Sequence, residues 1–294
     1  MTLEQQLLQY LFTGITNGAI YSLMALGFVA VYSVTGIINF AQGEFAMAGA
    51  LVAVSLDQAG LPLPASVFGG ILAVLLIASL LERSAIHPAR GASTLTLIII
   101  TIGLALAIRG IALLIWGTFP YKLPPFTVGP PLRPFGAMIR LQSLWVMGVT
   151  LLVLILLYLF FELTVTGKSL RACAINRVAA RLMGIDPDRM SLLSFGLSGA
   201  LGAVGGILVS PIIFPTYDMG VMLGLKGFVA AAMGGLASYP VAALGGLILG
   251  VVESYGAGLV ASGLKDAIAL FLLFVILVYK PGWLFKAEAA EERV

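Results

Sequence analysis

The charged residues of this chain are few, and five basic ones lie together between residues 168 and 189. This segment reads KSLRACAINRVAARLMGIDPDR and separates two long apolar runs. Its arginines can bind the carboxylates of another molecule through paired hydrogen bonds, which lysine cannot form. The segment is therefore a candidate docking surface. The alternative is a basic loop that only fixes the orientation of the neighbouring apolar segments.

The same segment has the sequence signals of a short helix. Ser169 is a candidate N-cap residue, and Gly184 stands where a helix would end. Pro187 prevents any continuation. We therefore predict one helix from Ser169 to Met183, followed by a turn.

Two faces of this predicted helix differ in chemistry. Arg177 and Arg181 are four residues apart and would share one face. Ala180 and Gly184 would share another, where small side chains let a partner approach closely. The two faces together favour close docking that is fixed by arginine contacts.

Ionisable residues also occur inside apolar runs, where each costs about 2.5–3.5 kcal/mol on membrane insertion and usually faces a cavity or a partner. They are Glu44, Arg109 and Glu253. Asn39 and Gln42 precede Glu44 and predict an interrupted helix whose freed backbone lines a cavity. The alternative is that these side chains cap helices and bond to neighbouring ones, and that Arg109 reaches the interface or pairs with a carboxylate.

Motifs for nucleotide binding and hydrolysis are absent from the sequence. It contains no Gly-x-x-x-x-Gly-Lys-Ser/Thr loop, so we expect no binding of ATP by this chain itself. Neither a Gly-x-Ser-x-Gly elbow nor a His-Glu-x-x-His motif occurs. One histidine, His87, and one cysteine, Cys173, cannot build a zinc site of the usual kind. We expect no catalytic residue and no metal.

The composition predicts a membrane protein. Of the 294 residues 60% are hydrophobic and only 10% are charged, too few to cover a water-facing surface. The net charge of +3 does not suggest a nucleic-acid partner, and the N-terminus has no signal-peptide features. We predict an all-α, polytopic transmembrane helical bundle of eight to ten spans, some broken or re-entrant. The segments lie near 10–33, 43–57, 63–82, 94–116, 143–162, 190–213, 224–238, 240–259 and 264–280.

Basic residues predict the orientation of these spans. The loop 163–189 should be cytoplasmic, and counting spans places 83–93 and the tail after Lys280 on the same side. The proline-rich loop 117–142 and the N-terminus then fall outside. Small residues four apart, as in Gly246-x-x-x-Gly250, favour close packing between helices of the chain, with a subunit interface as the alternative.

Several motifs resemble one family. Ala179 to Gly184 resembles the Glu-Ala-Ala-x-x-x-Gly loop of ABC-transporter permease subunits, with Val178 at the Glu position. Residues 39–44 resemble the Asn-Phe-Ala-His-Gly-Glu segment of the high-affinity branched-chain amino acid permeases, with Gln42 replacing His. Further matches to that family are Gly227-Phe228, the Gly-Gly-Leu repeats at 234–236 and 245–247, and segments 250–253 and 280–285. The resemblance extends from about residue 10 to residue 286.

The resemblance implies a non-catalytic subunit of an ATP-driven importer for amino acids of the branched-chain type or related small solutes. Its implied partners are a second, related permease subunit, two ATP-binding cassette subunits that use the ATP, an extracytoplasmic substrate-binding protein and the lipid bilayer. The implied location is the cytoplasmic (inner) membrane of a prokaryote. Residues 1–286 would form one permease domain, and 287–294 a cytoplasmic tail.

Within that domain we expect residues 170–187 to be a coupling helix that inserts into a groove on an ATPase subunit. The residues expected to couple are Arg171, Asn176, Arg177, Ala179, Ala180, Arg181, Gly184 and Ile185. The residues expected beside the translocation pathway are Asn39, Gln42, Glu44 and Glu253. The main alternative is a stand-alone secondary transporter or channel, in which acidic residues would relay protons or bind a cation.

Overall fold

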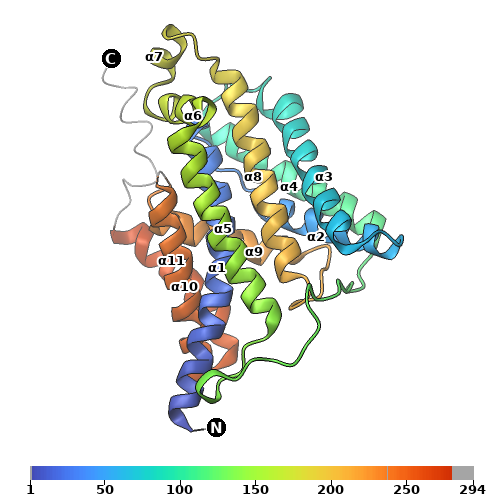
Figure 1. Ribbon diagram of the computed structural model, residues 1–294. Coiled ribbons are helices and arrows are strands. Elements are labelled where there is room, and N and C mark those ends of the chain that lie inside the picture. Colours follow the sequence, from blue (N-terminus) through green and yellow to red (C-terminus); the bar gives the residue numbers. More distant parts are fainter. Residues whose placement is uncertain (1, 237, 280–294) are drawn as a thin grey trace.

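The computed structural model describes residues 2–236 and 238–279, and Figure 1 shows a helical bundle. Within these residues there is one isolated bridge, between Leu132 and Ile139, and no longer strand, which confirms the all-α prediction. The α-helices are α1 (Leu3–Thr35), α2 (Gln42–Gln58), α3 (Leu63–Leu81), α4 (Thr94–Trp116), α5 (Leu141–Leu163), α6 (Val165–Ile175), α7 (Arg177–Leu182), α8 (Pro187–Val209), α9 (Met219–Met233), α10 (Tyr239–Leu259) and α11 (Lys265–Tyr279).

Each of the nine predicted apolar segments corresponds to one helix. In the described part of the chain, six helical stretches are long and apolar enough to cross a membrane: α1, α3 with the π-helical turn η1 (Glu82–Ile86), α4, α5, α8 and α10. The remaining three, α2, α9 and α11, have 15 to 17 residues. The expected polytopic bundle with some short or broken spans is therefore confirmed.

Helix α1 forms the centre of the bundle. Its middle is buried between α10 and α8, with α9 and α5 beside them, while α2 and α3 pack on α8. By contrast, α4 and α5 are mostly exposed and present leucine and isoleucine side chains outward. In water such faces would be unfavourable, so they suit contact with lipid or with another membrane subunit.

The close approach of α1 and α10 depends on small residues. A Cβ atom added to Gly250 would lie 2.3 Å from the backbone nitrogen of Gly18, and one on Gly246 would lie 2.5 Å from that of Ser22. No larger side chain fits at these positions unless the helices move apart. The predicted small-residue pattern of α10 therefore packs helices within the chain.

The chain between α1 and α2 is not helical. Residues 37–41 connect the two helices, and their backbone is held by Thr101 of α4. The hydroxyl of Thr101 lies 3.2 Å from the backbone nitrogen of Phe40, which donates to it, and 3.2 Å from the carbonyl oxygen of Ile38. A side chain of a neighbouring helix thus compensates for the missing helical hydrogen bonds. The predicted interruption before Glu44 is confirmed.

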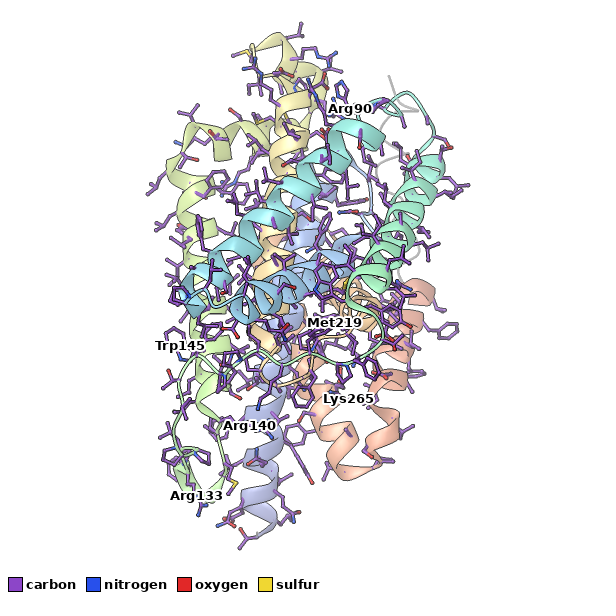
Figure 2. All side chains as sticks on the ribbon, turned by 90° about the vertical axis from the view of Figure 1, so that its right-hand side faces the viewer. Arg90, Arg133, Arg140, Trp145, Met219 and Lys265 are labelled. Atoms are coloured by element: carbon purple, nitrogen blue, oxygen red, sulfur yellow. The ribbon has the colours of Figure 1, made fainter. Side chains whose placement is uncertain are left out.

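The two ends of the bundle match the predicted grouping of loops. Arg90, in the loop after η1, forms ion pairs with Glu82 and with Asp188 at the start of α8. At the opposite end, Gln9 of α1 exchanges two hydrogen bonds with the backbone of Met138, at 2.7 and 3.0 Å. Loops 83–93 and 163–189 therefore share one end, and the N-terminus and loop 117–142 share the other (Figures 1 and 2). The expected motif 280–285 and tail 287–294 lie outside the described residues.

The prediction of one helix from Ser169 to Met183 is wrong. The segment forms two helices, α6 and α7, separated at Asn176, whose backbone is extended (φ −157°, ψ 108°). The Asn176 side chain accepts a hydrogen bond of 2.9 Å from the backbone of Ala179 and so caps a new helix. Thr164, and not Ser169, caps α6. Gly184 ends α7 as predicted, with φ +82°.

Candidate functional site

Helices α6 and α7 lie at one end of the bundle, where α7 protrudes beyond α5 and α8 (Figure 1). They expose apolar side chains there. Ile175, Val178, Leu182 and Met183 are each more than 70% exposed. They alternate with Arg177 and Arg181 in the sequence. An exposed group of apolar residues with arginines between them is typical of a protein interaction surface. We call residues 175–184 the α6–α7 surface.

The expected coupling residues include polar and small residues of this surface but none of its large apolar side chains. Asn176, Ala179, Arg181 and Gly184 are exposed, as a docking role requires, and Arg177 and Ile185 are half-buried. The missed residues are Ile175, Val178, Leu182 and Met183. Their exposure could have been predicted from the sequence. They lie in a short basic segment outside the apolar runs, where there is little hydrophobic core in which apolar side chains could be buried.

Two of the expected coupling residues make contacts that hold α6 and α7 to the bundle. Ala180 is 4% exposed and belongs to the same buried apolar cluster as Leu170 and Cys173 of α6, so it helps to hold α7 in place and does not contribute to its outer face. Arg171 lies 2.6 Å from Glu162 at the end of α5, and its guanidinium stacks over Phe161. These contacts tie α6 to α5.

The turn after α7 connects the α6–α7 surface rigidly to α8. The backbone nitrogen of Ile185 donates to the carbonyl of Ala180 at 3.0 Å, which closes the end of α7. Asp186 then caps α8 by accepting from the backbone nitrogens of Asp188 and Arg189. These hydrogen bonds, first that from Asp188, hold the pKa of the Asp186 carboxyl below its usual value. A force on α7 would therefore reach α8 through a short, ordered link.

A second candidate site lies in the membrane-spanning part, where Glu44 and Arg109 meet. Glu44 stands in the first turn of α2 and is 2% exposed, while the side chain of Arg109, in α4, is 28% exposed. The Nε of Arg109 donates to Glu44 Oε1 at 3.1 Å, and its Nη2 donates to the same oxygen. Of the two alternatives for Arg109, reaching the membrane interface or pairing with a carboxylate, the structure shows the pairing.

This ion pair borders a cavity of about 220 Å³. Most of the other side chains around it are apolar and come from α1, α4, α9 and the segment before α2; they are Phe28, Phe40, Ile102, Ala105, Leu106, Val221 and Leu225. Gly220 and Gly224 complete the lining. The cavity therefore offers one carboxylate and one guanidinium against apolar walls.

Gln42 and Asn39 make contacts within the bundle. Gln42 is fully buried, its amide nitrogen donates to the carbonyl of Ser198 at 3.1 Å, and its amide oxygen accepts from the Ser198 hydroxyl. Asn39 is 1% exposed and accepts from the backbone of Ala41, while its amide nitrogen has no partner among the described residues. Neither residue borders the Glu44 cavity. Gln42 thus fixes the start of α2 to α8.

Glu253 lies in a buried cluster of charges. Its Oε1 is 3.0 Å from the ammonium of Lys226, 3.3 Å from that of Lys265 and 3.0 Å from the hydroxyl of Tyr21. Lys226 also lies 2.7 Å from Asp266. The cluster connects α1, α9, α10 and α11. Sequence reasoning used Lys226 only as the limit of an apolar run and missed its role.

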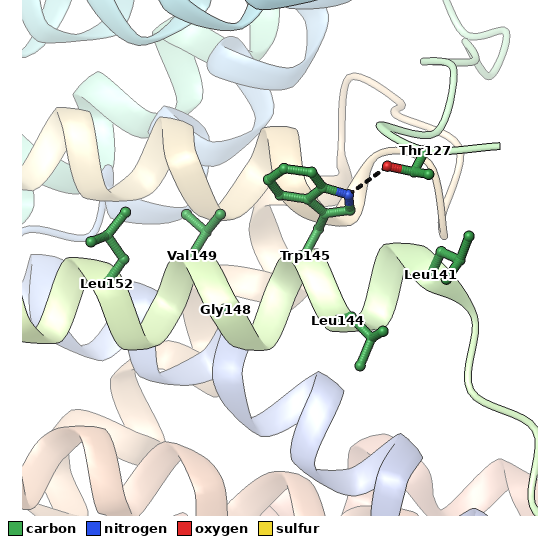
Figure 3. A pocket seen from close by; sticks show the side chains of 7 residues that line it. All are labelled: Thr127, Leu141, Leu144, Trp145, Gly148, Val149 and Leu152. Atoms are coloured by element: carbon green, nitrogen blue, oxygen red, sulfur yellow. Dashed lines mark hydrogen bonds between the residues drawn. The ribbon is translucent and has the colours of Figure 1, made fainter. Parts of the chain in front are cut away.

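The exposed side of α5 carries an apolar groove of about 350 Å³ (Figure 3). Trp145 lies at its centre and donates from its indole nitrogen to Thr127 Oγ1 at 2.9 Å. The other lining residues are Leu141, Leu144, Gly148, Val149 and Leu152, so none of the described residues brings a charge to the groove. A tryptophan at the end of an exposed apolar helix suits the boundary between lipid and water. In the described part of the chain no cluster of three metal-ligating side chains occurs.

Comparisons with known proteins agree with this architecture. A family model described as a branched-chain amino acid transport system permease component matches residues 10–278. The permease protein LivH of the high-affinity branched-chain amino acid transport system of Salmonella typhimurium is 33% identical, over 93% of this chain and 94% of its own length.

Two further relatives come from other organisms. BraD of Pseudomonas aeruginosa, a permease protein of a high-affinity branched-chain amino acid transport system, is 33% identical over 93% of this chain and 94% of its own length. A probable branched-chain amino acid permease, LivH of Methanocaldococcus jannaschii, is 31% identical over 88% and 86%. The chain therefore belongs to the family of permease components of branched-chain amino acid transport systems.

Proposed function

We propose that this chain is one membrane subunit of an ATP-driven importer and forms half of the pathway for a branched-chain amino acid or a related small solute. The relatives named above, each a permease protein of a branched-chain amino acid system, support the solute class. The second half of the pathway is a related permease subunit. An extracytoplasmic binding protein delivers the solute, and two ATP-binding cassette subunits supply the force.

The observation that carries the proposed coupling is the α6–α7 surface. Its apolar side chains are more than 70% exposed, and a partner that covers them is stabilised by about 25 cal/mol for each Å² of apolar surface that is buried. Arg177 and Arg181 add contacts to carboxylates of that partner. Asn176, Ala179 and Gly184 shape the same surface and Ile185 adjoins it, whereas Arg171 and Ala180 hold it to the bundle. Closure of the ATPases moves α7, and the capped turn at Asp186 passes this motion to α8.

Of the four proposed pathway residues, Glu44 has the strongest support. Of Asn39, Gln42, Glu44 and Glu253, it is Glu44 that borders the 220 Å³ cavity described above. Asn39 and Gln42 hold the interrupted segment that places Glu44 there. Glu253 does not border this cavity; it joins α9 to α10 and α11 and so stabilises the position of α9, which lines the cavity.

The remaining assignments follow from the same proposal. The chain catalyses no reaction and holds no cofactor, since its partners bind and hydrolyse the ATP. It lies in the inner membrane of a prokaryote as a multi-pass protein, as its relatives from Salmonella and Pseudomonas suggest. The α6–α7 surface and the tail 287–294 face the cytoplasm, and loop 117–142 faces outward.

Reconstitution into liposomes tests the proposal. We expect uptake of radiolabelled L-leucine, or of another branched-chain amino acid, only when the chain is combined with its partner permease, both ATPase subunits, the binding protein and ATP. Omission of any one component should abolish uptake. Uptake by liposomes that contain this chain alone, driven by a proton or sodium gradient, would contradict the proposal and support the stand-alone transporter.

A further inference from the structure

A groove of about 420 Å³ opens on the side of the bundle and is lined by residues of α1, α5, α6 and α10. Its floor is made of buried apolar side chains, among them Leu26, Leu157 and Ala243, none of which is more than 6% exposed. Its rim is open, since Tyr158 and Leu244 are 64% and 57% exposed. An apolar group can therefore enter this groove from the side of the bundle.

Among the described residues that line this groove, Arg171 of α6 is the one with a charge, and we call it the Arg171 groove. The Nη2 of Arg171 donates to a carboxylate oxygen of Glu162 at 2.6 Å, and its guanidinium lies over the ring of Phe161, 5.7 Å from the ring centroid. The guanidinium makes no other hydrogen bond with the described residues, and the side chain is 46% exposed. Because arginine has five N–H donors, most of them are left for an acceptor that the described chain does not supply.

The surroundings of Arg171 are positive. Lys168 lies three residues before it on α6, is exposed, and shares a face of the helix with it. Glu162 offsets one of these two positive charges. Both cations lie at the end of the bundle that carries α6 and α7 (Figure 1), the end that faces the cytoplasm under the proposed function. Anionic headgroups of the cytoplasmic leaflet attract lysine and arginine at this level of a membrane protein.

From this arrangement we propose that the Arg171 groove binds one anionic phospholipid of the cytoplasmic leaflet. One of its acyl chains lies on the apolar floor between α5 and α10. Its phosphate accepts hydrogen bonds from the remaining donors of Arg171, with Lys168 beside it. This inference goes beyond the proposed function. It requires the chain to lie in a membrane with α6 at the headgroups, and it holds equally if the chain transports its solute alone.

The apolar floor and the arginine together identify the occupant. A volume of about 420 Å³ holds roughly fourteen groups of ~30 Å³, the size of a water molecule, so much of one acyl chain fits. A small free anion would bind Arg171 but leave the apolar floor uncovered. An apolar helix of a second subunit would cover the floor but leave the guanidinium without an acceptor, which is costly in a buried interface. A phospholipid satisfies both, because its phosphate stands at one end of a hydrocarbon chain.

Photocrosslinking of the full chain tests this inference. The chain is reconstituted into phosphatidylcholine nanodiscs that contain a small share of phosphatidylglycerol with a diazirine on one acyl chain, and labelled peptides are identified by mass spectrometry. We expect labels on the peptides that contain residues 154–161 and 243–247, at least fivefold above those on the exposed face of α4. Phosphatidylcholine with the same diazirine should label these peptides at least fivefold less, and excess unlabelled phosphatidylglycerol should remove the label.

Charge variants separate phosphate binding from a structural role of the ion pair. Arg171→Gln removes the donors to the phosphate and should lower labelling by phosphatidylglycerol at least fivefold, whereas Arg171→Lys keeps a positive charge and should retain most of it. Glu162→Gln breaks the same ion pair but frees Arg171, so it should raise labelling. The control is Arg189→Gln, because the Arg189 side chain is 81% exposed and does not line the groove, and it should have no effect.

A second pair of variants tests the position of the acyl chain. Leu244→Trp places a large side chain at the rim of the groove and should lower the label on both peptides at least threefold. Val252→Trp introduces the same side chain two turns further along α10, at a position that is 41% exposed and does not line the groove, so it should leave labelling unchanged. This pair stays informative if the charge variants do not fold.

The outcomes separate this inference from the proposed function. Equal labelling by the two lipids, equal labelling of α4 and of the groove peptides, or a fall in labelling with Glu162→Gln would overturn the lipid site. The same measurement on the chain assembled with its partner permease should give the same labels. Loss of the label on assembly would show that the second subunit covers the groove, and would overturn the site as well. None of these results depends on transport, so the proposed function is refuted separately, by absence of uptake in the reconstituted importer.

Discussion

The ammonium of Lys226 and the carboxylate of Glu253 lie 3.0 Å apart, and both side chains are at least 93% buried, on α9 and α10. Lys265 and Asp266, at the start of α11, bind to the same two residues. Two positive and two negative charges thus compensate one another between three short or medium helices. Helices α9 and α11 have only 15 residues each and so form short packing interfaces with their neighbours. The charge cluster adds contacts that hold these two helices to α10.

Replacement of one partner should destabilise the bundle. Lys226→Met leaves the Glu253 carboxylate buried with less compensation, although Lys265 and Tyr21 still contact it. We expect a loss of about 3 kcal/mol in the free energy of unfolding, at the low end of the range for broken buried pairs. Reversible unfolding in mixed micelles measures this loss.

The control is an ion pair in an exposed position. Arg189 lies 3.2 Å from Asp186, but its side chain is 81% exposed, so Arg189→Met should leave the unfolding transition unchanged. The double variant Lys226→Met/Glu253→Met should recover most of the stability that Lys226→Met loses. Equal stabilities of wild type and Lys226→Met would refute a structural role of the cluster.

Glycines on α10 should tolerate no side chain where α1 approaches. Gly250→Ala would place its Cβ atom 2.3 Å from the nitrogen of Gly18, and the helices must separate. We expect a loss of about 1–3 kcal/mol, as for other overpacked sites. Gly148→Ala on α5 is the matched control, because no atom lies within 4 Å of its added Cβ. Thermal unfolding should rank Gly250→Ala below wild type and Gly148→Ala level with it or above.

The α6–α7 surface should be sensitive to bulk without any change in fold. Ala179→Trp adds a large side chain at an exposed helical position, so it should block docking and lower ATP-driven uptake at least tenfold. Ala92→Trp alters another exposed alanine, in the loop after η1 at the same end, and should transport normally. Uptake by Ala179→Trp at the wild-type rate would rule out docking through this face.

Gly184 requires a different design, because its φ of +82° makes most substitutions strained, by about 1–2 kcal/mol. Asparagine adopts this conformation more readily than other residues, so Gly184→Asn should keep the turn and the position of α7. Gly184→Val should strain the turn and uncouple hydrolysis from uptake. The ratio of ATP hydrolysed to leucine imported measures this effect. A ratio in Gly184→Val equal to that of Gly184→Asn would show that the turn geometry is irrelevant to coupling.

The sequence was sufficient to locate the apolar helices of the bundle. Charge-free runs located nine helices, because membrane burial excludes charged residues from most of each span. Gly184 likewise predicted the end of α7, and Pro187 predicted that this helix does not continue. The break at Asn176 was missed, since this asparagine could equally have continued a helix, and only its side-chain bond to Ala179 favours a new N-terminus.

The pairing of charges could not be predicted from the sequence. Glu44 and Arg109 are 65 residues apart, and Lys226 and Glu253 are 27 apart. Which carboxylate meets which cation depends on how α2, α4, α9 and α10 pack, and helix packing is determined by many small contacts such as those of Gly250. Burial of Ala180 was missed for the same reason, because the direction of α7 depends on how it packs against α6 and α8.

The most direct test of the coupling role uses a single introduced cysteine, Met183→Cys, on the α6–α7 surface. The native Cys173 is 2% exposed and burial raises the pKa of its thiol, so it should not react with a charged maleimide. A cytoplasmic docking surface predicts labelling of residue 183 in inside-out vesicles, none in right-side-out vesicles, and protection once the ATPase subunits are assembled. Labelling from the outer side, or labelling that the bound ATPases leave unchanged, would contradict it.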